Sequence, residues 1–194
     1  VTSTPARRER QGQESRQSMA TPIEPHRLDF PPEALPELER SSLYLILDRV
    51  RSAFNVGALF RTADGAAAER VLLVGLTPHP PHPQLEKTAL GGTSYVPWLY
   101  RESFTQARAE LPSEYQLVAL DNGPGSICLW DFEWPRHTAL VVGNEVEGVS
   151  EEALAECHHR VFVPMLGYKR SLNVTTASGI AIYDYLRTFR SGQG

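Results

Sequence analysis

The 194-residue sequence has no apolar stretch long enough to cross a membrane, and it has only two cysteines. Its first residues contain no apolar core of the kind found in signal peptides. Cys128 and Cys157 lie far apart and in no CxxC pair, which argues against a disulfide framework and against a cysteine zinc site. We therefore expect a soluble, cytoplasmic protein with no membrane partner and two buried thiols.

Several common catalytic and cofactor patterns are also missing. No GxGxxG is present, so the usual dinucleotide fingerprint is absent. Residues 143–150 have the glycine spacing of a phosphate-binding loop, but Val149 stands where that loop has its lysine. No Ser-His-Asp arrangement is readable. The histidines have no partners at metal-ligand spacing, and His158 and His159 would point to opposite sides of a regular element, so we expect no metal site.

Acidic residues outnumber basic ones, and the formal net charge is −4. This balance argues against broad, nonspecific binding to nucleic acid but is compatible with a local basic patch. Five basic residues fall in or beside the loops described below: Arg51, Arg61, Lys87, Lys169 and Arg170. They either form such a patch or are scattered surface charges.

Residues 1–40 differ in composition from the rest. A charged run over residues 7–16 and five prolines between positions 22 and 36 leave little to bury. We expect a flexible segment here, either a plain linker or an arm that touches RNA. The remaining residues, 41–194, are expected to form one domain.

From residue 43 onward, short apolar runs alternate with stretches of helical spacing. Core strands are predicted over five apolar runs, at residues 43–47, 71–74, 116–120, 139–142 and 161–163. Helices are predicted over residues 56–67, 84–89, 104–111, 151–157 and 173–187, with an edge strand over 95–98. This order predicts an α/β fold, with a mostly parallel sheet, helices on both faces, and a ligand site beyond the carboxyl ends of the strands.

The stretch from 161 to 180 is predicted to be a strand, a polar loop and a helix. Pro164 ends the strand, Gly167 gives the loop conformational freedom, and Asn173 is a good N-cap. A strand, a loop and a helix N-terminus form a common ligand-binding unit, and Ser171 and Asn173 lie at its mouth. The same residues also suit a plain capped connection.

Two further loops each follow a predicted strand. At 55–63, Asn55 is expected to cap a helix that carries Arg61 in its second turn. An arginine with apolar neighbours on both sides usually binds a carboxylate or phosphate, although a surface arginine is the alternative. At 143–148, Glu145 lies between two glycines, where it either orients a backbone or ligand group or is an ordinary turn residue.

These three loops, in this order, resemble the motifs of the SpoU (TrmH) family of RNA ribose 2′-O-methyltransferases, within the SPOUT superfamily. The similar patterns are NxGxxxRTA at 55–63, GxExxG at 143–148 and PMxGxxxSLNV at 164–174. Residues 87–91 with 96–98 also resemble a pattern of the single-domain members. The likeness covers about residues 43–188.

The resemblance implies a deep trefoil knot in the C-terminal part, a homodimer with the site near its interface, and S-adenosyl-L-methionine as methyl donor. By motif position, the residues that bind this cofactor would be Gly143, Val163, Leu172, Leu120 and Met165. The catalytic residues implied in the same way are Arg61, Asn55, Glu145, Ser171 and Asn173.

The implied reaction is attack of a ribose 2′-oxygen of tRNA or rRNA on the methyl carbon of the cofactor, without a metal. The family's arginine is proposed to be the base, but free arginine has a pKa above about 12. We therefore expect Arg61 to bind the adjacent phosphate and stabilise the developing alkoxide, while the phosphate helps to take the proton.

The other implied residues have supporting roles. Asn55 would hold Arg61 or the ribose, and Glu145 would orient the arginine or asparagine side chains. Ser171 and Asn173 would shape the cofactor loop and the RNA entrance. A catalytically silent RNA-binding protein on the same fold is the alternative, and the missing fingerprints disfavour another nucleotide-binding enzyme.

Overall fold

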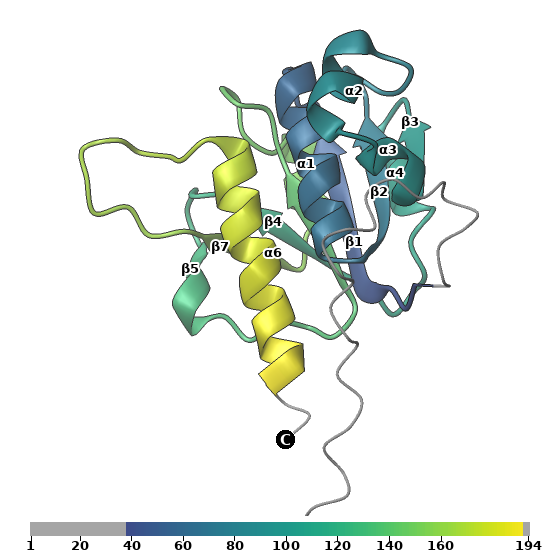
Figure 1. Ribbon diagram of the computed structural model, residues 1–194. Helices are drawn as coiled ribbons and strands as arrows, with labels where there is room; N and C mark the ends of the chain where they lie inside the picture. The colour runs from purple at the N-terminus through teal and green to yellow at the C-terminus, as the bar shows by residue number, and fades with distance from the viewer. Residues whose placement is uncertain (1–37, 192–194) are drawn as a thin grey trace, which may run out of the picture.

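The computed structural model describes residues 38–191, so nearly all of the predicted flexible segment lies outside the described residues. Seven strands form one sheet, in the order β3-β2-β1-β6-β4-β7-β5, and all neighbours are parallel (Figure 1). The strands are β1 Ser41–Asp48, β2 Ala68–Val74, β3 Trp98–Arg101, β4 Gln116–Leu120, β5 Ile127–Cys128, β6 Thr138–Val142 and β7 His159–Phe162. The predicted parallel α/β sheet is confirmed.

Helices cover both faces of this sheet, as predicted (Figure 1). They are α1 Ala53–Gly65, α2 Pro83–Ala89, α3 Gly92–Tyr95, α4 Phe104–Arg108, α5 Glu151–Glu156 and α6 Val174–Ser191, with a 3-10 turn, η3, at Leu129–Asp131. One core cluster includes residues of α1, α2 and α6, and the other includes residues of α4 and α5. Among the described residues, no helix combines the length and the apolar character needed to cross a membrane.

The central strand β1 shows why its sequence is apolar throughout. Leu43 and Leu45 belong to the core on the α1 and α6 side, whereas Tyr44 and Ile46 belong to the core on the α4 and α5 side. Successive side chains of a strand point to opposite faces, so a strand covered on both faces needs apolar residues at every position. Asp48, at the end of the strand, is also buried and accepts a hydrogen bond from the Ser150 N–H, at 2.7 Å.

Three local predictions need correction. Helix α1 begins at Ala53 rather than at residue 56, because Ser52 caps it. The edge strand lies at Trp98–Arg101 rather than at 95–98, because residues 92–95 form a helical turn after Gly91, whose φ is 88°. Strand β5 was not predicted, since two residues show no periodicity.

Helix α1 packs closely against α2 at Gly57. A Cβ built on Gly57 would lie 2.5 Å from the carbonyl oxygen of Leu85 and 2.1 Å from the hydroxyl of Thr88. Only glycine permits this approach, so the contact fixes α1, and with it the loop that precedes α1, against the rest of the domain.

Replacing Gly57 with alanine should therefore lower the free energy of unfolding by about 1–3 kcal/mol, through overpacking. The matched control is Gly167→Ala, because a Cβ on Gly167 meets no atom within 4 Å; its effect should stay within about 0.5 kcal/mol. Urea unfolding of the two variants measures both values. Equal midpoints for Gly57→Ala and the original protein would show that the helices are not in close contact.

Candidate functional site

A hollow of about 600 Å³ lies beyond the carboxyl ends of three neighbouring strands, β6, β4 and β7. This is the edge at which parallel α/β sheets bind ligands, as the sequence predicted. Leu120, Val142, Val163 and Leu172 supply apolar lining. The volume is within the usual range for small-molecule sites, which is roughly 300–1,000 Å³.

Most residues predicted from the sequence to form a site meet at this hollow. Those that line it are Leu120, Gly143, Glu145, Val163, Ser171, Leu172 and Asn173. Asn55 is joined to it by a hydrogen bond to Glu145. Met165 and Arg61 are not among its lining residues; Met165 is half-buried in the loop after β7, and Arg61 is exposed on α1.

The carboxylate of Glu145 accepts three hydrogen bonds from the start of α1. The backbone N–H groups of Arg51 and Ser52 donate to it at 3.0 and 3.1 Å, and the Asn55 amide donates at 2.8 Å. The N-terminus of a helix has unpaired N–H groups and a partial positive charge, so it favours a carboxylate. Glu145 therefore fixes the 143–148 loop against the 51–55 loop.

The side chain of Asn55 continues this series of hydrogen bonds to the third loop. Because its Nδ2 donates to Glu145, its Oδ1 is left to accept from the Asn173 Nδ2, at 3.5 Å. The Asn173 Oδ1 in turn accepts from the backbone N–H and the hydroxyl of Thr175, at 2.8 and 2.6 Å. Asn173 thus caps α6 as predicted, and the three loops form one connected network.

The prediction that Asn55 caps α1 is wrong. The hydroxyl of Ser52 accepts from the Asn55 N–H, at 3.3 Å, so serine is the N-cap. The Asn55 amide is therefore free of the helix and binds Glu145 and Asn173 instead.

Two opposing effects set the pKa of Glu145. Partial burial acts to raise this pKa, but hydrogen bonds from the Arg51 N–H, the Asn55 amide and the Ser52 N–H outweigh burial and lower it. The side chain is consequently an ionised acceptor near neutral pH. Its role in the network requires the charged form.

The 143–148 loop is closed on itself chiefly by Asn144, which the sequence motif does not mark. Asn144 and Gly148 exchange two backbone hydrogen bonds at 2.9 Å, and the Asn144 Oδ1 accepts from the Val146 and Glu147 N–H groups. A Cβ on Gly143 would lie 2.2 Å from the Gly148 backbone, so only glycine fits there. One feature of the sequence could have indicated this role: Asn144 directly follows a predicted strand and Gly143.

Three further contacts hold loops at the rim of the hollow, and none of them was predicted from the sequence. The Asn144 amide donates to the Arg49 carbonyl at 3.0 Å, and the Arg49 guanidinium pairs with Glu147. After β4, the Asn122 amide donates to the Arg170 carbonyl at 2.8 Å. These partners are distant in the sequence, so no local pattern reveals them.

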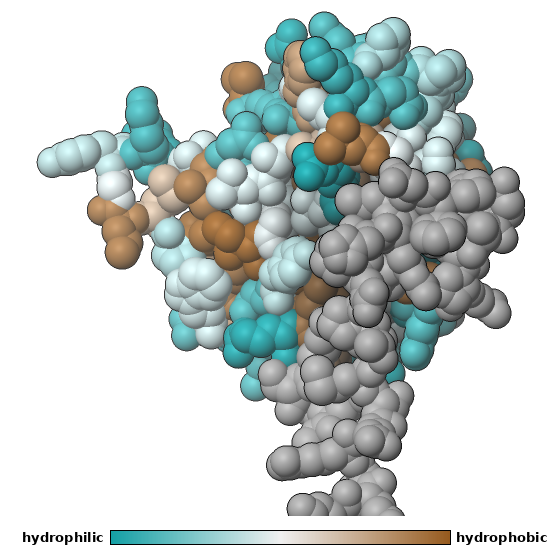
Figure 2. Space-filling view, viewed as in Figure 1, coloured by the Kyte–Doolittle hydropathy of each residue, from teal (hydrophilic) through white to brown (hydrophobic). Residues whose placement is uncertain are grey.

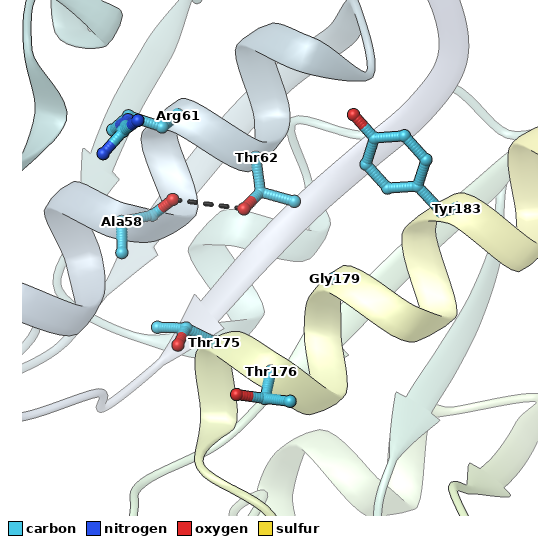
Figure 3. Close-up of a pocket in the computed structure, with 7 residues that line it drawn as sticks. All are labelled: Ala58, Arg61, Thr62, Thr175, Thr176, Gly179 and Tyr183. Carbon is cyan, nitrogen blue, oxygen red and sulfur yellow. Dashed lines mark hydrogen bonds between the residues drawn. The ribbon is translucent and has the colours of Figure 1, made fainter.

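Arg61 lies in a second hollow, of about 510 Å³, between α1 and α6 (Figure 3). Thr175, Gly179 and Tyr183 line the α6 side of this hollow. Thr175 also hydrogen-bonds to Asn173, which lines the larger hollow, so the two hollows adjoin at the start of α6.

Positive charge near the two hollows is largely unpaired. The described part of the chain contains three ion pairs, and they use Arg49, Arg101 and Arg187. None of them uses Arg51, Arg61, Lys169 or Arg170. These cations are therefore available to an anionic ligand, although the larger hollow is also lined by the carboxylates of Asp121, Glu145 and Glu147 and the net charge of the chain is −4. Within residues 38–191, no three acidic, histidine or cysteine side chains are grouped to hold a metal ion.

The chain matches the SpoU rRNA Methylase family over residues 42–183. It is 33% identical over 161 residues to the 23S rRNA (guanosine-2′-O-)-methyltransferase RlmB of Bordetella pertussis, covering 80% of this chain and 63% of the relative. It is 28% identical over 146 residues to the tRNA (guanosine(18)-2′-O)-methyltransferase of Escherichia coli, covering 75% and 63%. The chain thus spans a little under two thirds of the length of these curated relatives.

Solved structures with the same fold include the SpoU methyltransferase AviRb from Streptomyces viridochromogenes in complex with its cofactor AdoMet. The TM-score is 0.70 at 26% identity, covering 80% of this chain and 63% of that one. The A. aeolicus TrmH/SpoU tRNA modifying enzyme gives a TM-score of 0.69 at 26% identity, covering 80% and 79%.

The lowered pKa of Glu145 predicts how stability depends on pH. Its stabilising contribution should be complete above the unfolded carboxyl pKa, about 4.3, and should be lost as the pH falls through the lower folded value. Glu145→Gln should cost no more than about 1 kcal/mol near neutral pH, because Glu145 and Asn173 are exposed to water. Below about pH 4 the difference from the original protein should shrink.

Chemical unfolding across this pH range measures the difference. Glu133→Gln is the matched control, because Glu133 is exposed and lies outside the network. A Glu145→Gln effect that grows on acidification would contradict the hydrogen-bonding role.

Proposed function

Because the chain belongs to the SpoU rRNA methylase family, we propose that it is an RNA methyltransferase that uses S-adenosyl-L-methionine to methylate a ribose 2′-hydroxyl in tRNA or rRNA. Its relatives include enzymes named for each of the two RNA classes. The observation that carries the proposal is the hydrogen-bonded series Glu145–Asn55–Asn173, which joins the three motif loops beside one hollow.

The residues of the hollow suit this cofactor. Leu120, Val163 and Leu172 offer apolar surface for a purine ring, with Met165 in the same loop, and Gly143 lines the hollow without a side chain. When bound, S-adenosyl-L-methionine would supply an activated methyl group on a sulfonium. The protein must then provide alignment of the ribose and a destination for its proton.

The chain's own polar groups would meet these two needs. Arg61, exposed and without an ion pair among the described residues, would bind the phosphate beside the target ribose and stabilise the oxygen as its proton leaves. The phosphate would help to accept that proton. Asn55 would hold the ribose or Arg61, oriented by Glu145, while Ser171 and Asn173 shape the entrance.

We further propose that the protein is a homodimer with the site near its interface. Supporting this, the Arg61 hollow is open on the joint surface of α1 and α6, and it is lined by small residues such as Ala58 and Gly179 and by Tyr183, which is 55% exposed. In a dimer, Arg61 would act at the hollow of its own chain or at that of its partner.

Three more proposals follow from the family. The C-terminal part would be threaded as a trefoil knot; the hydrogen bond from Asn122 to the loop before α6 supports this, because it holds the two segments side by side. Residues 41–194 would be the methyltransferase domain, with residues 1–40, nearly all of which lie outside the described residues, as a separate N-terminal segment. The protein would act in the cytoplasm, on the RNA classes that its relatives modify.

The rival from another class is a catalytically silent RNA-binding protein on this fold. It would not need the connected side chains of Asn55, Glu145 and Asn173. Calorimetry with S-adenosyl-L-methionine, ATP and NAD separates a methyltransferase from other nucleotide-binding enzymes, and mass-spectrometric mapping of 2′-O-methyl nucleotides in cells lacking the gene would identify the RNA.

Arg61→Ala should abolish methyl transfer and leave the affinity for S-adenosyl-L-methionine within about twofold, since Arg61 does not line the larger hollow. Transfer of a tritiated methyl group to RNA from cells lacking the gene measures the first effect, and calorimetry measures the second. Arg136→Ala is the control. Arg136 is exposed and lies just before the amino end of strand β6, whereas the hollow lies beyond the carboxyl end of that strand. Retained turnover in Arg61→Ala would refute the assignment.

A further inference from the structure

The loop between β7 and α6 extends well away from the body of the protein (Figures 1 and 2). Two large side chains near its tip are fully exposed: Leu166 has an exposed fraction of 101% and Tyr168 one of 107%. Full exposure of an aromatic ring leaves both of its faces available to a ligand. The ring therefore has no packing role among the described residues.

Two exposed cations, Lys169 and Arg170, directly follow Tyr168. Neither takes part in an ion pair within the described part of the chain, whereas Arg49 nearby pairs with Glu147. Three carboxylates line the larger hollow: Glu147 pairs with Arg49, Glu145 accepts hydrogen bonds from the start of α1, and Asp121 accepts one from the Gly123 N–H. The tip thus combines an open aromatic face with uncompensated positive charge.

This combination fits single-stranded RNA better than it fits another protein. Proteins bind single strands with aromatic rings that stack on bases and with cations that follow the phosphates. The cores of protein interfaces share the tyrosine and the arginine but are depleted in lysine, so Lys169 favours RNA. In a duplex the base faces are stacked against each other, so Tyr168 would find no partner there.

The base of the loop is held where such a contact would be useful. The Asn122 amide binds the Arg170 carbonyl at 2.8 Å, and Ser171 and Leu172 line the larger hollow. Tyr168 is three residues from Ser171, a reach of at most about 11 Å. Successive nucleotides are about 3.4 Å apart along a stacked strand, so the ring can reach a base near the methylated ribose.

We propose that Tyr168 stacks on an unpaired base close to the methylated nucleotide, with Lys169 and Arg170 binding the adjoining phosphates. The substrate of the enzyme is then an unpaired segment of RNA, such as a loop, and not a regular duplex. This inference rests on the proposed function and adds a determinant of substrate choice to it.

Binding to two probes tests the inference: the single strand (AC)₆, which cannot pair with itself, and its duplex with (GU)₆, each labelled with fluorescein. With the full chain, anisotropy should show tighter binding to the single strand. Tyr168→Ala should weaken that binding by about 5- to 100-fold. Tyr168→Phe, which keeps the ring, should stay within about twofold, and Tyr168→Leu should resemble alanine. Duplex binding should not change in any of these variants.

The salt dependence tests the cations separately. Lys169→Gln should reduce the slope of log affinity against log salt by about 0.7 for the single strand. Arg136→Gln should leave the slope unchanged, because Arg136 lies before the amino end of strand β6, away from the loop that carries Tyr168.

Equal affinities of Tyr168→Ala and the original protein for (AC)₆ would overturn the inference. It would also be overturned if Tyr168→Ala lost affinity equally for the single strand and the duplex, or if the original protein bound the duplex more tightly. A change in oligomeric state of Tyr168→Ala in sedimentation would overturn it too, because the ring would then contact a second copy. A separate assay tests the proposed function: the original protein is given tritiated S-adenosyl-L-methionine and RNA from cells lacking the gene, and methyl transfer is measured. Absence of transfer by the original protein would instead refute the proposed function.

Discussion

The structure of the site depends on the hydrogen bonds that the Glu145 carboxylate accepts at the start of α1. A charged acceptor at a helix N-terminus makes stronger hydrogen bonds than a neutral one and sets the direction of those that follow. Because Glu145 must accept, Asn55 must donate to it, and Asn55 can then only accept from Asn173. One ionised group therefore orients two amides and aligns three loops.

The parallel sheet makes this alignment possible. Strands β6, β4 and β7 are neighbours whose carboxyl ends lie at one edge, so the loops after them share a hollow. Strand β1, next to β6, brings the start of α1 to the same edge. Tight packing at Gly57 and Gly143 holds the loops in place. The basic groups near the hollow, Arg51, Arg61, Lys169 and Arg170, take part in none of the ion pairs of the described residues, although the chain as a whole is acidic.

Sequence patterns predicted much of the fold because they are local. The apolar run at 43–47 indicated a strand buried on both faces, and Asn173 indicated the start of α6; both are confirmed. Asn55 was misassigned as a cap because Ser52, three residues earlier, is an equally good one. Its actual partner, Glu145, is 90 residues away, and no local rule predicts such a contact. The roles given to all the site residues stay predictions, and Arg61 and Met165 differ from most of the others in not lining the larger hollow.

A double-mutant cycle on methyl transfer tests most directly whether the network acts as one unit. Glu145 and Asn173 are connected through Asn55, so Glu145→Gln and Asn173→Ala should each disturb the same alignment. The account predicts that the variant with both changes transfers methyl groups to RNA about as fast as the slower single variant. Rate losses that multiply would show that the two residues act independently, and would contradict it.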